Sequence, residues 1–180
     1  MNSSPQHLKQ TPRFIAVEGA IGVGKTSLTR RLAETFNYEL LLERAEENPF
    51  LDRFYRNPRK HALATQLFFL FQRAQQIAEL RQNDMFEPVR VSDFLIEKDR
   101  LFAELNLEKD EYELYHKVYQ HLVINAPKPD LVIYLQADTD TLMKNIEHRG
   151  REMESDIAYD YIDALGQVYT EYFFRYQDTP

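Results

Sequence analysis

Residues 19–26 read G-A-I-G-V-G-K-T, which fits the phosphate-loop pattern G-x-x-x-x-G-K-[ST]. An apolar run at 13–18 precedes this segment and an amphipathic run at 25–36 follows it, as a strand–loop–helix unit requires. In such a loop, backbone N–H groups cradle phosphates, the lysine adds a positive charge and the hydroxyl binds Mg²⁺. A flexible glycine turn would leave the Lys25–Thr26 pair unexplained, so we predict a nucleotide-phosphate site. The residues expected to form it are Gly19, Ala20, Ile21, Gly22, Val23, Gly24, Lys25, Thr26 and Ser27.

Four short apolar runs, bounded by polar or breaking residues, predict the strands of a parallel sheet. They are residues 13–18, 38–43, 88–93 and 130–137. Helical patterns lie between and after them, at residues 25–36, 58–82, 94–103, 108–124, 139–148 and 158–176. Because strands alternate with helices, we expect an α/β fold of the P-loop NTPase type, with three α/β/α layers around a central parallel sheet.

The chain has 180 residues, a length that suits one domain. We expect a loose polar tail over 1–12, a single domain over 13–180, and a further strand and helix beyond Pro180. The net charge of −7 argues against binding a nucleic acid polymer, and no apolar run approaches the length of a membrane span. The absence of cysteine excludes disulfides and thiolate sites and fits a reducing compartment, so we expect a cytoplasmic protein.

Three carboxylates stand at the ends of predicted strands, namely Glu18, Glu43 and Asp93. In a parallel sheet the ligand crevice lies beyond the carboxyl ends of the strands, so all three are expected to point towards the phosphate loop. Glu43 is placed to orient an attacking hydroxyl, although a solvated carboxylate would look the same in sequence. Glu18 suits a structural role at least as well as a chemical one. Asp93 suits Mg²⁺ binding together with Thr26.

The guanine-reading motif N-K-x-D of GTPases is absent from the sequence. The phosphate loop and the strand-end carboxylates alone are still compatible with an ATPase.

Four longer segments narrow the class of protein. They read GAIGVGKTSL, LLLERAEENPFLDRFY, VSDFLIEKDRLFA and HRGREMESDI…DYI, and they begin at residues 19, 40, 91 and 148. Together they resemble the deoxyribonucleoside kinase family, which includes bacterial deoxyadenosine and deoxyguanosine kinases. The likeness runs from about Phe14 to Tyr176. The phosphate loop is a superfamily signal, whereas the segment around Glu43 and the arginine-rich segment carry the narrower resemblance.

The resemblance implies a role for each matching position on the acceptor side. Glu43 matches the strand-end glutamate that acts as a base towards the nucleoside 5′-hydroxyl. Tyr55 and Glu154 match a pair that holds the sugar 3′-hydroxyl. Lys25, together with Mg²⁺, is expected to neutralise the phosphates of ATP.

Base recognition is implied for a second group of residues. Gln66 and Arg73 are separated by seven residues and therefore share one helix face. They match base-reading positions, and Asp99 matches the acidic partner of that arginine. An arginine on an otherwise apolar helix face would be a costly choice without such a charged partner. Core or half-buried packing is the alternative explanation for Gln66 and Tyr55.

A small helical lid at about 149–157 is also implied, in which Arg149 and Arg151 close over the transferring phosphates. Two positions depart from the family pattern. The family often has an acidic-Arg-Ser triplet after the third strand, where this chain has Asp-Phe-Leu at 93–95. Asn145 stands where other members often carry a further lid arginine.

The resemblance thus implies Mg²⁺-dependent transfer of the ATP γ-phosphoryl group to the 5′-hydroxyl of a deoxyribonucleoside. Deoxyadenosine and deoxyguanosine are the favoured substrates, and deoxycytidine is the alternative. One alternative is a nucleoside monophosphate kinase similar to thymidylate kinase, although the carboxylate of Glu43 would repel an acceptor phosphate. Another is a nucleotide-dependent switch that has no small acceptor. The family usually forms dimers, and the aromatic and leucine-rich segments 58–82 and 108–124 are candidates for a homodimer face.

Overall fold

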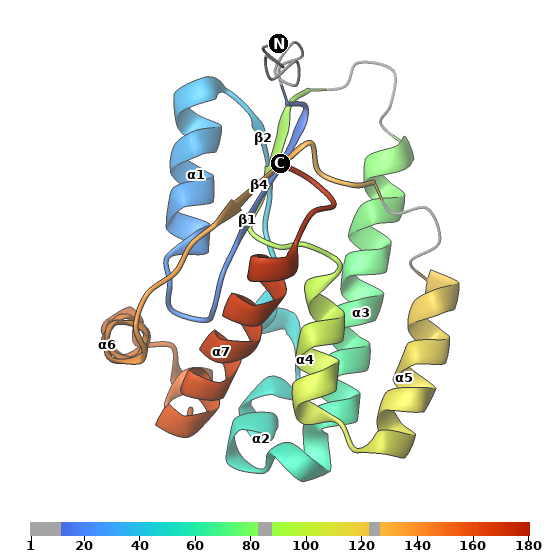
Figure 1. Cartoon of the computed structure of the whole chain (residues 1–180), viewed down its shortest axis with the longest axis vertical. Helices are drawn as coiled ribbons and strands as arrows, with labels where there is room; N and C mark the ends of the chain where they lie inside the picture. Colours follow the sequence, from blue (N-terminus) through green and yellow to red (C-terminus); the bar gives the residue numbers. More distant parts are fainter. Residues whose placement is uncertain (1–11, 83–87, 123–126) are drawn as a thin grey trace, which may run out of the picture.

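The central feature of the structure is a parallel β-sheet. A computed structural model describes residues 12–82, 88–122 and 127–180. Within these residues the strands pair in the order β2-β3-β1-β4 (Figure 1). Their bounds are Phe14–Glu18 for β1, Glu39–Leu41 for β2, Arg90–Ser92 for β3 and Leu131–Tyr134 for β4. All four strands were predicted from the sequence, with bounds one to three residues wider.

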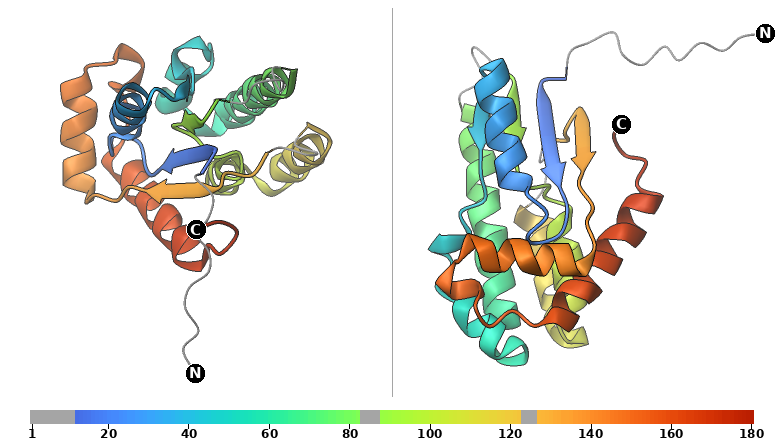
Figure 2. Two further views of the ribbon diagram at one scale, coloured as in Figure 1. Left: turned by 90° about the horizontal axis from the view of Figure 1, so that it is seen from above. Right: turned by 90° about the vertical axis from the view of Figure 1, so that its left-hand side faces the viewer.

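Helices cover both faces of this sheet. Figure 1 shows α1 on one side of the strands and α3, α4 and α7 on the other, and the view from above in Figure 2 agrees for α1 and α7. The three-layer α/β/α fold predicted from the sequence is therefore confirmed. The helices are α1 (Lys25–Phe36), α2 (Leu51–Arg56), α3 (Pro58–Gln82), α4 (Lys98–Asn106), α5 (Lys109–Leu122), α6 (Thr139–Arg149) and α7 (Tyr159–Arg175). Two single 3₁₀ turns, Ala45–Glu47 and Glu152–Glu154, lie in the connections.

Side chains of strand β1 are buried on both faces of the sheet, because successive residues of a strand point to opposite faces. Ile15 and Val17 are buried with Ala33 of α1. Glu18 points to the opposite face, where its carboxylate accepts a hydrogen bond from the hydroxyl of Tyr169 in α7 at 3.1 Å. The strand therefore ends with a fully buried carboxylate directly before the phosphate loop.

The prediction of a helix over 94–103 was wrong at its start, because α4 begins only at Lys98. The reason is a tertiary contact that competes with the local helical pattern. The backbone N–H of Leu95 donates to the buried Glu18 carboxylate at 2.6 Å, and the hydroxyl of Ser92 donates to the carbonyl of Phe94 at 2.8 Å. These bonds fix the chain just after β3, and a turn through Glu97, whose backbone angles are already helical, leads into α4.

Helix α2 was not predicted, since its six residues are too few for a clear helical period. The predictions for α1 and α3 match the observed bounds, and those for α6 and α7 differ by one residue at the ends. Residues 1–11 of the predicted tail and residues 123 and 124 of the predicted fifth helix lie outside the described residues. In the described ranges, no helix combines the length and the apolar character needed to cross a bilayer.

Candidate active site

The phosphate loop connects β1 to α1. At two of its positions the loop backbone lies so close to a neighbouring segment that only glycine fits. A Cβ atom on Gly19 would lie 2.3 Å from the carbonyl oxygen of Leu135, just after β4. A Cβ atom on Gly22 would lie 2.6 Å from the carbonyl oxygen of Leu142 in α6. Both glycines also have positive φ angles, 149° and 87°, which side chains rarely tolerate. Glycine at these two positions therefore lets the loop pack closely against the backbone of neighbouring segments.

Lys25 begins α1 and turns back across the loop. Its ammonium donates to the carbonyl oxygens of Gly19 at 2.7 Å and Ala20 at 3.1 Å. Burial and the nearby ammonium of Lys98 lower the pKa of Lys25 to about 8, against the opposing effect of the surrounding carboxylates. Lys25 is thus a cation held by the phosphate loop, and no carboxylate among the described residues forms an ion pair with it.

Thr26 and Asp93 form the part of the site that fits a magnesium ion. The Thr26 hydroxyl donates to Asp93 Oδ2 at 2.6 Å, and Asp93 Oδ1 accepts the backbone N–H of Glu43 at 2.7 Å. Residues 12–82, 88–122 and 127–180 contain no cluster of three or more carboxylate or imidazole side chains arranged for a metal. Mg²⁺ in phosphoryl-transfer sites is held through one or two protein oxygens plus water and substrate phosphates, so the Thr26–Asp93 pair is sufficient.

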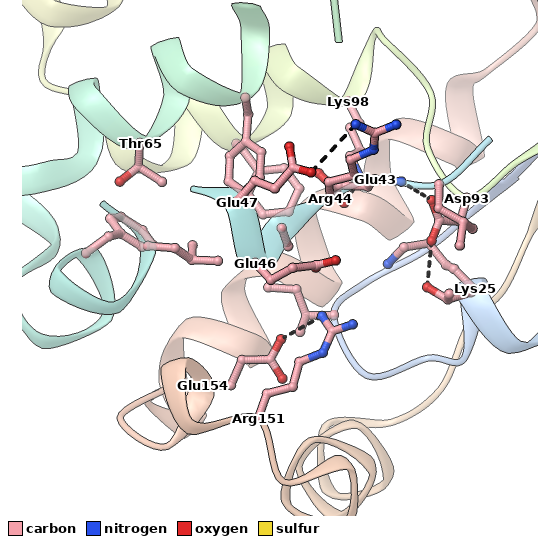
Figure 3. Close-up of a pocket in the computed structure, with 18 of the residues that line it drawn as sticks. Lys25, Glu43, Arg44, Glu46, Glu47, Thr65, Asp93, Lys98, Arg151 and Glu154 are labelled. Carbon is pink, nitrogen blue, oxygen red and sulfur yellow. Dashed lines mark hydrogen bonds and ion pairs between the residues drawn. The ribbon is translucent and has the colours of Figure 1, made fainter. Parts of the chain in front are cut away.

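A cavity of about 410 Å³ lies between the phosphate loop and helices α3 and α4. This volume is in the range of small-ligand pockets. In Figure 3, Lys25, Glu43 and Asp93 lie across the pocket from Arg151 and Glu154. Predicted residues from distant parts of the sequence meet here, whereas Ser27 is exposed and does not line the cavity. The predicted residues that line it are Ile21, Lys25, Thr26, Glu43, Tyr55, Gln66, Arg73, Asp93, Asp99, Arg149, Arg151 and Glu154.

Glu43 follows β2, and two cations hold its carboxylate. One oxygen pairs with Arg73 of α3, and the other accepts a hydrogen bond from Lys98 of α4 at 3.0 Å. Burial alone would raise the pKa of Glu43, but Lys98, Arg73 and Lys25 together lower it to about 2. Glu43 is therefore an anion at neutral pH, and it lines the same cavity as Lys25 of the phosphate loop.

Arg73 and Asp99 form the ion pair that the resemblance implied, at a side-chain exposure of 4% and 3%. The guanidinium of Arg73 also lies over two aromatic rings, with its Cζ 5.2 Å from the centroid of Phe69 and 5.6 Å from that of Phe94. The residue in place of the family's usual arginine is thus a ring that stacks on Arg73. Among the described residues, Asp99 Oδ2 and Arg73 Nε have no hydrogen-bond partner. Buried polar atoms usually pair with protein groups or ordered water, and both residues line the cavity.

Glu154 pairs with both arginines of the segment that was predicted to form a lid. Its carboxylate, 5% exposed, pairs with Arg149 at 2.5 Å and with Arg151 at 3.6 Å. Gly150 lies between the two arginines with a φ of 63° and ends α6. Tyr55, which was expected to act with Glu154, lines the same pocket.

Asn145 accounts for the second departure from the family pattern. Its side-chain amide donates to the carbonyl oxygen of Gly22 at 2.8 Å and so ties α6 to the phosphate loop. At this position the chain makes a neutral contact with the loop instead of adding another cation to the lid.

Sequence reasoning missed Lys98, whose side chain is 4% exposed and contacts Glu43. In the helix predicted over 94–103 this lysine was an ordinary mid-helix residue. The available signal was the charged stretch Glu97–Lys98–Asp99, which comes directly after the apolar run 94–96. Such a stretch is unusual in a buried segment unless its charges have partners.

Three comparisons with known proteins agree with this geometry. The family model for deoxynucleoside kinases matches residues 15–180. A deoxyguanosine kinase of Bacillus subtilis is 38% identical over 157 residues, which cover 86% of this chain and 75% of the relative. A deoxyadenosine/deoxycytidine kinase of the same organism is 30% identical over 177 residues, covering 93% of this chain and 79% of the relative.

Solved structures show the same relationship. A deoxyadenosine kinase from M. mycoides with bound dATP superposes with a TM-score of 0.79 at 28% identity, covering 91% of this chain and 84% of that one. The same kinase with dCMP and dCDP bound gives a TM-score of 0.81, covering 93% and 87%. The fold and the site thus define a P-loop kinase, and the chain belongs to the deoxynucleoside kinase family.

Proposed function

We propose that this enzyme transfers the γ-phosphoryl group of ATP to the 5′-hydroxyl of a deoxyribonucleoside. The observation that carries this proposal is the position of Glu43. Its side chain lines the same pocket as Lys25, two residues after the end of β2, and its backbone N–H donates to Asp93 Oδ1 at 2.7 Å. A hydroxyl hydrogen-bonded to Glu43 would face the phosphate loop. In-line phosphoryl transfer depends mainly on this kind of positioning and on charge neutralisation.

Charge neutralisation is assigned to Lys25, Mg²⁺ and the lid. Lys25 would reach the β- and γ-phosphates, and Thr26 with Asp93 would hold Mg²⁺, in part through water. Arg149 and Arg151 would exchange part of their pairing with Glu154 for the phosphates as the lid closes. This exchange would free the Glu154 carboxylate to act with Tyr55 on the sugar 3′-hydroxyl.

The base pocket is assigned to Gln66, Arg73 and Asp99, and it favours purines. A carboxylate accepts hydrogen bonds and a guanidinium donates them. Asp99 Oδ2 is free to accept from an exocyclic amine, as adenine and cytosine present, and guanine has a carbonyl and a ring nitrogen for the arginine. Thymine would turn a carbonyl towards the carboxylate. The two relatives are named a deoxyguanosine kinase and a deoxyadenosine/deoxycytidine kinase, which supports a purine substrate and leaves deoxycytidine as the alternative.

A homodimer is part of the proposal. Phe71 of α3 and Leu114 of α5 are 54% and 50% exposed, although both are large apolar side chains. They lie on the two helices expected to form the subunit interface. Sedimentation analysis would test this, with a monomer at micromolar concentration as the contrary result.

A nucleoside monophosphate kinase, the alternative kinase class, needs an acceptor site with unpaired cations. A nucleoside monophosphate brings a dianion, but the cations nearest Glu43 are already paired with Glu43 and Asp99. The test is a product assay with ATP, Mg²⁺ and a panel of four deoxynucleosides and their four 5′-monophosphates. We expect monophosphates to form from the deoxynucleosides. Diphosphate formation from the monophosphates, with inert deoxynucleosides, would overturn the proposal.

A further inference from the structure

Lys98 is a buried cation in the pocket wall, and none of the roles proposed above involves it. It is the first residue of α4, and its side chain turns into the pocket wall with 4% exposure. Its ammonium donates to Glu43 Oε2 at 3.0 Å and lies 3.8 Å from Glu18 Oε1. Lys98 therefore contacts the acceptor carboxylate and also approaches Glu18, the last residue of the strand before the phosphate loop.

The hydrogen bonds of Glu18 do not depend on this lysine. Glu18 Oε2 accepts the backbone N–H of Gly19 at 3.0 Å and the hydroxyl of Tyr169 at 3.1 Å. Glu18 Oε1 accepts the backbone N–H of Leu95 at 2.6 Å. Both oxygens already have donors, and the 3.8 Å separation from Lys98 is too long for a hydrogen bond. The directed contact of the lysine is the one with Glu43.

Glu43 is held from two helices by two cations of different shape. Arg73 of α3 grips Oε1 with a planar guanidinium that is also paired with Asp99 and stacked between Phe69 and Phe94. That arginine is therefore fixed by the base pocket. Lys98 grips Oε2 from α4, on the side of β1, with a compact ammonium that has three donors. The second contact sets the rotation of the carboxylate relative to the phosphate loop.

We propose that Lys98 is a positioning residue for phosphoryl transfer, which holds the Glu43 carboxylate in the orientation that aims the acceptor hydroxyl at the phosphate loop. This inference rests on the proposed function, since it assigns Lys98 a role through Glu43. A misplacement of about 1 Å at a reacting centre can cost about 10²-fold in rate. Loss of Lys98 is therefore expected to lower kcat while it leaves the KM for ATP nearly unchanged.

The test is a double-mutant cycle in the full chain, with Lys98→Met, Glu43→Gln and the double variant. Lys109→Met is the matched control, because Lys109 is exposed at the start of α5. The kcat and both KM values are measured with ATP and deoxyadenosine, and a thermal melt checks folding. We expect Lys98→Met to lower kcat about 10²-fold in the wild-type background but by less than about 3-fold when Glu43 is already glutamine.

Equal losses in the two backgrounds would overturn the inference, as would a folded Lys98→Met with wild-type kcat. If Lys98→Met does not fold, Lys98→Gln replaces it in the cycle, because glutamine keeps a donor and loses the charge. The proposed function is judged separately by the unaltered enzyme. If wild type phosphorylates deoxyadenosine and the cycle is additive, only the role of Lys98 fails. If wild type phosphorylates no deoxynucleoside, the proposed function fails first.

Discussion

Replacing Asp99 by asparagine tests the base pocket, because it removes the negative charge and replaces one oxygen by an NH₂ group while the side chain keeps nearly the same shape. Asp99 Oδ1 pairs with Arg73, and Oδ2 has no partner among the described residues. Because a guanidinium can only donate, the asparagine oxygen is expected to stay on Arg73, which leaves the amide NH₂ where Oδ2 was. An adenine amine would then meet a donor instead of an acceptor.

The magnitude follows from this mismatch. A hydrogen bond to a charged group contributes about 1.5–3 kcal/mol. At 1.4 kcal/mol for each factor of ten, kcat/KM for deoxyadenosine should fall about 10- to 150-fold. Thymidine should be unaffected or improve, since its carbonyl can accept from the new NH₂. Arg73 keeps its pairing with Glu43, so the protein is expected to remain folded.

The assay is kcat/KM for four deoxynucleosides with wild type and Asp99→Asn. Asp110→Asn, an exposed residue in the first turn of α5, is the control for the loss of one carboxylate. If the ratio between deoxyadenosine and thymidine is unchanged in a folded Asp99→Asn variant, Asp99 does not read the base. Thymidine as the best substrate of the unaltered enzyme would refute the pocket assignment as a whole.

Three further predictions concern the phosphate end of the site. Lys25→Ala should lower kcat by at least about 10²-fold, because it removes a positive charge at the phosphates. The melting temperature should be nearly unchanged, since the hydrogen bonds of the ammonium to described residues go to two loop carbonyls. A variant with normal turnover would contradict this prediction. Lys25 has a pKa lowered to about 8, so it is charged below that pH and neutral above it, and kcat/KM for ATP should fall above about pH 8. A profile that stays flat up to pH 10.5, the ordinary pKa of lysine, would argue against a lowered pKa. Arg149 and Arg151 are 33% and 36% exposed, and tryptic cleavage at them should slow when ATP and deoxyadenosine are added together. Cleavage at the same rate under saturating ligands would speak against a closing lid.

The sequence predicted the sheet and the helices on both faces, because those depend on local apolar periods. Several residues named from the phosphate-loop motif and the family resemblance also line one cavity. The prediction failed at residues 94–97, where a bond from Leu95 to the buried Glu18, 77 positions away, overrides the local helical pattern. The same error concealed Lys98, whose burial depends on where α4 begins. The pairing of Glu154 with Arg149 and Arg151 was also out of reach, since sequence spacing does not say which of several nearby charges will meet.

The central claim is that Glu43 directs the acceptor 5′-hydroxyl at the γ-phosphate of ATP. The most direct measurement is a single-turnover experiment with γ-labelled ATP and deoxyadenosine, run on wild type and on Glu43→Gln, with the label located in the product. We predict label on the 5′-oxygen of the nucleoside and a transfer rate reduced by about 10²-fold or more in the glutamine variant. Label at another position, or a folded Glu43→Gln enzyme that transfers at the wild-type rate, would contradict the claim.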